Sequence, residues 1–306
     1  MKRVCQTFVL YVENKMIRTK NIPKPSAILT ADWHLREDQP VCRTDDFGEA
    51  QWRKVNEVKQ MQAAFNCPVI HSGDLFNHWK PSPHLLSETI KNLPDQFYTV
   101  YGNHDLPQHN LDLSYKSGVH TLIEAGKVKL LVGVHWGQLP GNNFFQIDDK
   151  KILVWHIMNY QGRKPWPGCT DPSSASLIRK HPQYDLILTG HNHKTFVEEL
   201  DGRYLVNPGS ITRQDADQAT YDPCVFLWYA ENNTVEKHIL QHDKDVITRA
   251  HLDHTAERDA RIDAFITKLD GDWQAGMSFE DNLEQFKSIN HIKESVMEII
   301  YKSIES

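Results

Sequence analysis

Five short apolar runs, each followed at once by a polar or glycine-containing segment, constrain the fold of this chain more than any other feature. They cover residues 27–30, 68–71, 97–100, 152–155 and 186–189. Runs of this length that are apolar throughout are typical of strands buried on both faces of a sheet. Helical patterns lie between them at residues 47–65, 83–93, 115–124 and 173–180. Strands that alternate with helices predict an α/β layered domain.

The flanking parts of the chain have different patterns. Residues 5–18 predict a hairpin, and residues 196–240 predict antiparallel hairpins that complete the sheets of the domain. Beyond residue 247, apolar residues recur at helical spacing in two stripes, which are Ile262, Phe265, Ile266 and Leu269, then Phe279, Leu283, Phe286, Ile289, Ile292, Val296 and Ile299. We therefore expect a domain at 1–246 and a C-terminal helical extension at 247–306, with a kink near Asn290. Its apolar face either packs on the domain or docks on a partner.

Composition excludes several classes of protein. The formal net charge of the 306 residues is -6, so any contact with nucleic acid needs a local basic patch. The five cysteines lie far apart without a Cys-x-x-Cys pair, which argues against a disulfide framework and a thiolate zinc site and favours a reducing, cytoplasmic setting. No apolar stretch approaches the roughly 18 residues of a membrane helix, so we expect no membrane span. Walker A, G-x-G-x-x-G and G-x-S-x-G motifs are absent.

Polar clusters follow the five apolar runs. They are Asp32-Trp33-His34, Gly73-Asp74, Gly102-Asn103-His104-Asp105, His156 and Gly190-His191-Asn192-His193. Because loops at the carboxyl ends of strands converge in α/β domains, we expect these clusters to meet in space. Carboxylates and imidazoles with one amide and no thiolate suit manganese, iron or zinc. Each cluster alone is a common surface or core feature, but their ordered occurrence after strands predicts a metal site.

The order of these motifs resembles the calcineurin-like metallophosphoesterase superfamily, over residues 27–211. The resemblance implies an α/β fold in which two packed β-sheets, a two-sheet sandwich, are flanked by helices and hold two divalent metal ions at the sheet edge. It implies that one ion is bound by Asp32, His34, Asp74 and His193, and the other by Asp74, Asn103, His156 and His191. Asp74 can bridge the two ions because a carboxylate has two oxygens.

The resemblance also implies a catalytic role for two further residues. A metal-activated hydroxide would attack the phosphodiester, with manganese the first choice of metal and iron or zinc the alternatives. His104 would not be a ligand; it would contact the phosphate and protonate the leaving oxygen. Asp105 would hold the His104 imidazole in the useful tautomer. His71, near Asp74, is expected to support the site or lie in the core.

Within the superfamily the sequence resembles the SbcD-type DNA repair nucleases more than the Ser/Thr protein phosphatases. The similarity lies in residues 30–35, in residues 73–76, and in Asn207-Pro208-Gly209-Ser210 followed by Arg213. Ser210 and Arg213 are candidates for binding the phosphate, although the segment could equally be a tight structural turn. Basic and aromatic residues could form a strand-binding rim, although solvated charges and half-buried tryptophans explain most of them; they are Trp33, Arg36, His78, Trp79, Lys80, Trp136, Arg163, Lys164 and Trp166.

Two departures keep other functions open. Asn77 stands where such nucleases often have an acidic residue or histidine, and little room is left for a separate DNA-capping domain. The leading hypothesis is a DNA exonuclease or endonuclease that works with an SbcC-like ATPase docked on the C-terminal helices, with a homodimer left open. The alternative is a phosphoesterase for a small nucleotide or cyclic nucleotide. A third class, a scaffold with a structural metal site, fits poorly with an intact His104-Asp105 pair.

Overall fold

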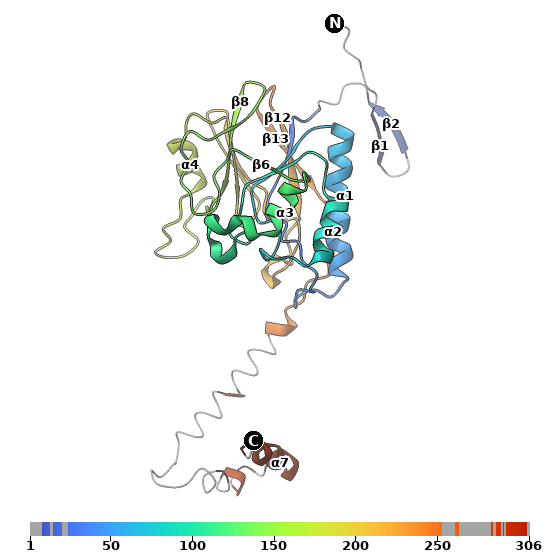
Figure 1. Ribbon diagram of the computed structural model, residues 1–306, viewed down its shortest axis with the longest axis vertical. Helices are drawn as coiled ribbons and strands as arrows, with labels where there is room; N and C mark the ends of the chain where they lie inside the picture. Colours follow the sequence, from blue (N-terminus) through green and yellow to red (C-terminus); the bar gives the residue numbers. More distant parts are fainter. Residues whose placement is uncertain are drawn as a thin grey trace. The chain divides into compact units, whose positions relative to one another are not determined.

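The computed structural model describes residues 8–12, 15–19, 24–252, 261–262, 283, 286–288, 290 and 292–304. The chain divides into two compact units, residues 1–248 and 249–306. The first unit contains both large sheets and all the candidate site residues (Figure 1). That the second unit docks on a partner stays a prediction.

A six-stranded sheet forms one layer of the first unit, in the order β13-β12-β3-β4-β5-β6. Its strands are β3 (Ala27–Thr30), β4 (Val69–His71), β5 (Phe97–Thr99), β6 (Lys129–Leu130), β12 (Cys224–Tyr229) and β13 (Thr234–Ile239). β3 to β6 run parallel to one another, whereas β12 is antiparallel to both β3 and β13. The parallel strands therefore all end at one edge of this sheet.

A five-stranded sheet forms the second layer, in the order β10-β11-β9-β8-β7. Its strands are β7 (Phe145–Ile147), β8 (Lys150–His156), β9 (Leu186–Gly190), β10 (Phe196–Leu200) and β11 (Arg203–Asn207). β8, β9 and β11 are parallel, and the antiparallel strands β7 and β10 lie at the edges. Leu29 and Ile70 of the first sheet share one buried cluster with Val154, Leu188 and Val206 of the second. The predicted two-sheet sandwich is confirmed.

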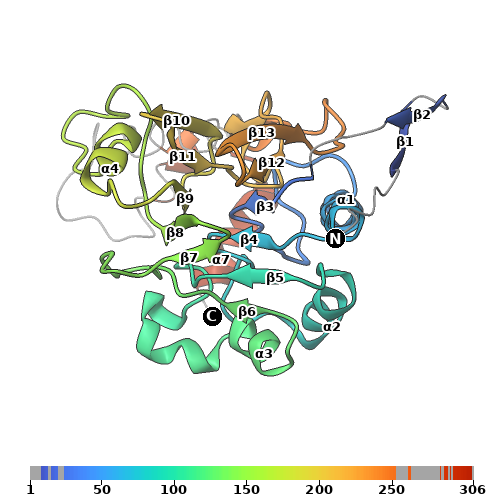
Figure 2. The same ribbon diagram turned by 90° about the horizontal axis from the view of Figure 1, so that it is seen from above.

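Helices cover the outer faces of the two sheets (Figure 2). They are α1 (Phe47–Phe65), α2 (Pro83–Asn92), α3 (Gly118–Glu124) and α4 (Ser174–Lys180), with 3₁₀ turns η1 (Pro107–His109), η2 (Leu111–Lys116) and η3 (Ala216–Gln218). Val55 of α1 and Leu85 of α2 pack with Ile28 of β3, whereas the next strand residue, Leu29, faces the other sheet. Leu177 of α4 packs against the five-stranded sheet. Strands buried on both faces explain the fully apolar runs.

Most expected elements are present, and the exceptions have local causes. Helix α1 occupies the predicted residues because Asp46 caps its N-terminus and Asn66 ends it in a left-handed conformation. The expected helix at 115–124 is split, since Ser117 is extended and caps α3 after the 3₁₀ turn η2. The edge strands β6 and β7 were not predicted because two or three residues are too few to show a period.

The ends of the chain are described in part. β1 (Phe8–Val12) and β2 (Lys15–Thr19) form the expected antiparallel hairpin. Helix α7 (Glu294–Ile304) covers the end of the second predicted apolar stripe. Most of the first stripe and the expected kink near Asn290 lie outside the described residues. In the part of the chain that the structure describes, no helix has the length and apolar character needed to cross a bilayer.

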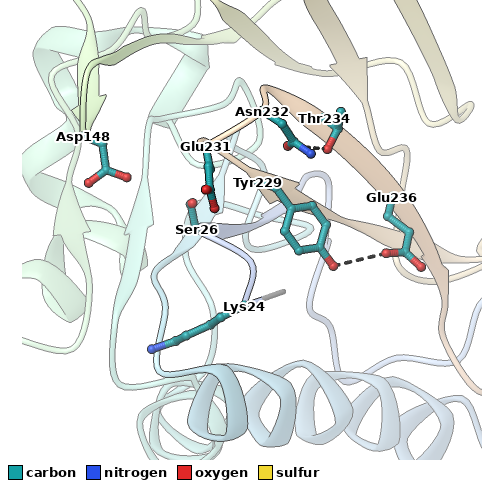
Figure 3. Close-up of a pocket in the computed structure, with 8 residues that line it drawn as sticks. All are labelled: Lys24, Ser26, Asp148, Tyr229, Glu231, Asn232, Thr234 and Glu236. Atoms are coloured by element: carbon teal, nitrogen blue, oxygen red, sulfur yellow. Dashed lines mark hydrogen bonds between the residues drawn. The ribbon is translucent and has the colours of Figure 1, made fainter. Parts of the chain in front are cut away.

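An open cavity of about 410 Å³ lies where β3 begins, beside the β12–β13 turn (Figure 3). Its lining includes Asp148, Glu231 and Glu236 with one lysine, Lys24, and the Tyr229 hydroxyl donates to Glu236 at 3.1 Å. The polar clusters follow the opposite ends of the parallel strands. This cavity is therefore separate from the candidate site, and its acidic lining does not suit a phosphate.

Candidate metal centre

The predicted ligands all lie where parallel strands end. Asp32 and His34 follow β3, Asp74 follows β4, Asn103 follows β5, His156 ends β8, and His191 and His193 follow β9. Both sheets therefore contribute to one site. Four of these residues have left-handed backbones, with φ of 49° at Asp32, 45° at His34, 59° at Asp74 and 78° at His191. Such conformations cost about 1–3 kcal/mol each outside glycine and cluster at functional sites.

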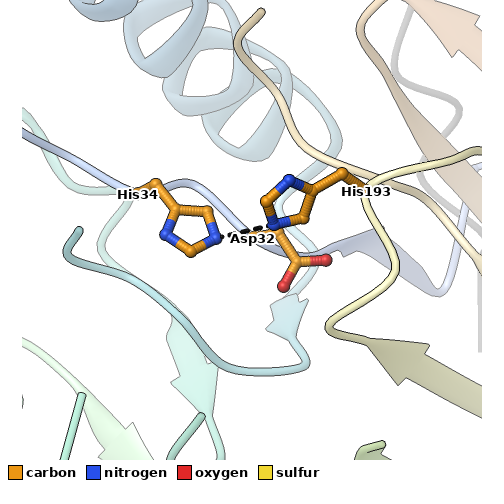
Figure 4. Close-up of side chains that lie close together, drawn as sticks. All are labelled: Asp32, His34 and His193. Carbon is orange, nitrogen blue, oxygen red and sulfur yellow. Dashed lines mark hydrogen bonds between the residues drawn. The ribbon is translucent and has the colours of Figure 1, made fainter. Parts of the chain in front are cut away.

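Asp32, His34 and His193 form the first group of ligand atoms (Figure 4). Their nearest donor atoms lie within 4.8 Å of one another. The Nε2 atoms of His34 and His193 face each other at 3.0 Å. Two imidazole lone pairs beside a carboxylate are the donors that a divalent cation of the manganese, iron or zinc type accepts. The residues present fit such an ion.

Asp74, His156 and His191 form a second group, also within 4.8 Å. The Asn103 amide oxygen lies 3.0 Å from His156 Nε2 and 2.8 Å from His191 Nδ1, so it belongs to the same group. His156 Nδ1 donates to the Ser72 carbonyl at 2.7 Å. Because a carbonyl can only accept, Nδ1 keeps its proton, and Nε2 is the nitrogen that would bind a cation after releasing its own proton.

Asp74 lies between the two groups. Its Oδ2 is 3.6 Å from His34 Nε2 and 3.3 Å from His156 Nε2, and its Oδ1 accepts from the His104 amide at 2.8 Å. Burial opposes ionisation of Asp74, but His156 and His34 outweigh it and hold the pKa of this carboxyl well below its usual range. Burial likewise opposes the charged form of His156, yet Asp74 raises the pKa of His156 to about 9. A cation bound here would displace that imidazolium proton.

His104 stands beside the first group without belonging to either predicted ligand set. Its ring meets the His34 ring edge-on, with centroids 4.7 Å apart. Its Nδ1 donates to the Asn77 carbonyl at 2.7 Å, so Nε2 is the nitrogen available to a substrate. His104, His34 and His193 line a cavity of about 180 Å³ together with Arg36. This geometry suits a proton donor at the edge of the metal site.

The expectation that Asp105 orients His104 is wrong. The carboxylate of Asp105 is fully buried and accepts four backbone N–H groups, those of Asp74, Leu75, Phe76 and Gly102. The group that fixes the His104 tautomer is the Asn77 carbonyl. The prediction relied on Asp105 following His104 directly in the sequence, but the Asp105 side chain turns toward the loop after β4.

The expectation that Arg213 binds phosphate is also wrong. Its side chain is buried, and its guanidinium donates to the carbonyls of Ala219, Asp243 and Lys244. Ser210 lines the cavity beside His104, but its hydroxyl donates to the Thr212 carbonyl at 2.6 Å. Because this hydroxyl is bonded within its own turn, the structure favours a structural turn over a phosphate-binding role for residues 207–210.

Asn207 has a role that the sequence pattern did not reveal. It is fully buried, and its amide donates to the carbonyls of Asn192 and Lys194, the residues on either side of His193. Thr189 donates to the Asn207 side-chain oxygen at 2.9 Å. The Asn-Pro-Gly-Ser segment therefore holds the loop that carries two predicted ligands.

The aromatic residues near the site have separate roles. Trp33 is fully buried and donates to Thr30, so it cannot form part of a binding rim. Trp136 is half-buried and stacks on the His191 ring, with centroids 4.7 Å apart and planes at 29°. His71 lies in the core, where burial lowers its pKa to about 3 and its Nδ1 is 2.8 Å from the Thr99 hydroxyl. Of these, Trp136 alone remains as a candidate wall of the site.

The sandwich and its clustered nitrogen and oxygen donors define a metal-dependent phosphoesterase. The family model described as the calcineurin-like phosphoesterase superfamily domain matches residues 28–226. The chain therefore belongs to this superfamily, as predicted.

Three relatives show the level of similarity. One is a DNA double-strand break repair protein Mre11 of Archaeoglobus fulgidus, 25% identical over an alignment of 235 residues, which covers 62% of this chain and 51% of the relative. Another is a protein of the same name from Methanosarcina acetivorans, 30% identical over 193 residues, covering 54% of this chain and 30% of the relative. A probable metallophosphoesterase of Methanocaldococcus jannaschii is 30% identical over 130 residues, covering 42% of this chain and 64% of the relative. The chain spans about half or less of the two Mre11 proteins.

Proposed function

We propose that this chain is a phosphodiesterase of the SbcD type that hydrolyses DNA at a centre of two divalent ions, with manganese as the first choice. The observation that carries the proposal is the position of Asp74, whose Oδ2 is 3.6 Å from His34 and 3.3 Å from His156. One ion would be held by Asp32, His34, Asp74 and His193, and the other by Asp74, Asn103, His156 and His191. When bound, the two ions would supply a water-derived nucleophile near neutral pH and neutralise charge on the phosphate.

The remaining chemistry belongs to His104. With Nδ1 bonded to the Asn77 carbonyl, its Nε2 would donate a proton to the phosphate or to the leaving oxygen. The cavity that His104 lines with His34 and His193 would admit the scissile phosphate beside the first group of ligands. Trp136, stacked on His191, would limit the site on the side of the second ion.

DNA as the substrate is supported by the relatives. Proteins named for DNA double-strand break repair align with this chain at 25% and 30% identity. The decisive experiment is a time course of cleavage of end-labelled single- and double-stranded DNA with manganese, beside a small chromogenic phosphodiester and a His104→Ala control. Cleavage of DNA that His104→Ala lacks is the expected result. Hydrolysis of the small diester alone would refute the DNA substrate and leave the metal chemistry standing.

A phosphoesterase for a small nucleotide or cyclic nucleotide is the second candidate. The cavity beside His104 is only about 180 Å³, which suits one phosphate with little else. The net charge of -6 also gives DNA no general attraction. This candidate requires activity on nucleotides and none on DNA in the same assay.

An SbcC-like ATPase is the proposed partner of the C-terminal helices. Val296 and Ile299 on α7 are 45% and 66% exposed, and apolar side chains at helical spacing are typical of a docking helix. Ile299→Asp should abolish co-purification of the ATPase, whereas Ser295→Asp, which adds the same charge at another exposed position of α7, should not. Equal retention by both variants would contradict docking at this face. A homodimer and a cytoplasmic setting stay predictions from the sequence.

A further inference from the structure

One buried carboxylate joins the two loops that carry the central ligands. Oδ2 of Asp105 accepts the backbone N–H groups of Asp74 at 2.8 Å and Gly102 at 3.0 Å. Oδ1 accepts those of Leu75 at 3.0 Å and Phe76 at 3.3 Å. Three of these donors belong to the loop after β4, and the fourth belongs to the loop after β5. Asp105 therefore ties neighbouring loops together through their main chains.

The loop after β4 needs such an anchor. Asp74 has a left-handed backbone with φ of 59°, directly after Gly73 with φ of 101°. A non-glycine residue holds this conformation only where its surroundings impose it. The neighbouring loop is packed closely against it, since a Cβ on Gly102 would lie 2.1 Å from Asp74 Oδ1. Small movements of either loop would displace the Asp74 carboxylate.

Burying the Asp105 carboxyl group costs free energy, because it loses its hydration. It is fully buried, and it forms no ion pair with a lysine or arginine in the described part of the chain. A buried carboxyl group without a cationic partner is tolerated in the interior only when several hydrogen bonds compensate for lost hydration. All the hydrogen bonds found for Asp105 go to the two loops that flank Asp74 and Asn103.

We propose that Asp105 is a positioning residue that sets Asp74 between the two ligand groups before any cation binds. The fold, and not the metal, then determines how far apart the two ions lie. This inference rests on the proposed two-ion centre. Asp105 acts through Asp74 and Asn103 and does not itself touch substrate or metal.

Asp105→Asn tests the proposal with little change in size. The amide nitrogen would face backbone N–H donors, so two of the four hydrogen bonds are lost and donors oppose each other. We expect the variant to bind the second manganese ion at least 10-fold more weakly. We also expect it to lose the exchange-coupled electron paramagnetic resonance signal of a bridged manganese pair. Asp185→Asn is the matched control, because the Asp185 carboxylate also accepts a backbone N–H, that of Lys151 at 2.9 Å, at the end of β8 away from His156.

The outcomes separate the proposals. A folded Asp105→Asn protein that keeps the coupled signal and the wild-type affinity would overturn the positioning role. A wild-type protein that binds fewer than two manganese ions would instead overturn the two-ion centre.

Hydrogen–deuterium exchange on the metal-free wild-type protein tests the positioning role of Asp105 whether or not the Asp105→Asn variant folds. Peptides that contain residues 73–76 and 102–105 should exchange as slowly as the adjoining strands while a chelator is present. If these amides exchange as fast as exposed loops and become protected only with manganese, the metal orders the loops and the role proposed for Asp105 is wrong.

Discussion

Gly102→Ala should inactivate the protein although it adds a single methyl group. The new Cβ would lie 2.1 Å from Asp74 Oδ1 and 2.4 Å from the Asp74 backbone nitrogen. Asp105 binds the Asp74 backbone nitrogen, and the buried Asp74 Oδ1 accepts from the His104 amide at 2.8 Å, so both neighbours are held in place.

The size of the effect follows from the overlap. Asp74 Oδ1 must retreat by about 0.9 Å to reach even the 3.0 Å below which real Cβ contacts are essentially never found. A misplacement of about 1 Å at a catalytic centre can reduce the rate on the order of 100-fold. The displaced group here is the proposed bridging ligand, so we expect kcat to fall at least 100-fold and metal content to drop below two ions per chain.

The assay compares manganese-dependent hydrolysis of a chromogenic phosphodiester with metal content and with the thermal transition of the same preparation. Gly141→Ala is the control, because a Cβ at this exposed glycine meets only the Asn143 side chain at 4.0 Å. Wild-type kcat and metal content in a folded Gly102→Ala protein would show that the loops adjust freely, and would refute the reasoning from rigid packing.

Three further predictions concern single residues. His104→Ala should keep the full metal content while kcat falls about 10²–10⁴-fold. Single-turnover rates and metal analysis of the same protein measure both quantities. Loss of metal would contradict the prediction that His104 is not a ligand. Asn207→Ala should weaken metal binding about 10–100-fold by removing the hydrogen bonds that hold the loop around His193. Calorimetric titration measures the metal affinity, and an unchanged affinity would mean that the loop keeps its conformation without Asn207. Burial lowers the pKa of Lys54 from 10.5 to about 8, so the unfolded chain binds more protons between these values and stability should rise with pH across that window. Below pH 8, the lowered pKa of Lys54 destabilises the wild type by about 3 kcal/mol, whereas its hydrogen bond to the Ala50 carbonyl stabilises it by about 1 kcal/mol. Lys54→Met should therefore be more stable than wild type by about 2 kcal/mol in this pH range. Denaturation at pH 7 and pH 10 should show this advantage shrinking, and an equal advantage at both values would exclude Lys54 as its source.

The sequence was informative wherever a short segment carries its own physical signal. Helix α1 occupies the predicted residues because a cap, an apolar period and a left-handed terminator all lie within its own sequence. The strands β3, β8 and β9 were visible because burial on both faces requires an unbroken apolar run. Edge strands such as β6 owe their conformation to hydrogen bonds with β5 and carry no comparable local signal.

The convergence of the polar clusters was also predictable, because parallel strands end at a common edge. Asp32, His34 and His193 meet there although 159 positions separate His34 from His193. The assignment of particular ligands to particular ions stays a prediction, although the position of Asp74 between the groups supports it.

The sequence by itself determined which elements form, their order, and which polar residues follow the strands. Only the tertiary structure decided what those polar side chains touch: Asp105 binds backbone amides instead of His104, and Arg213 binds backbone carbonyls. The physical reason is that buried main-chain donors and acceptors outside regular structure must find partners, and which side chain supplies them depends on segments distant in sequence. Local patterns record burial and chain direction, whereas hydrogen-bond partners in loops are set by the packing of the whole domain.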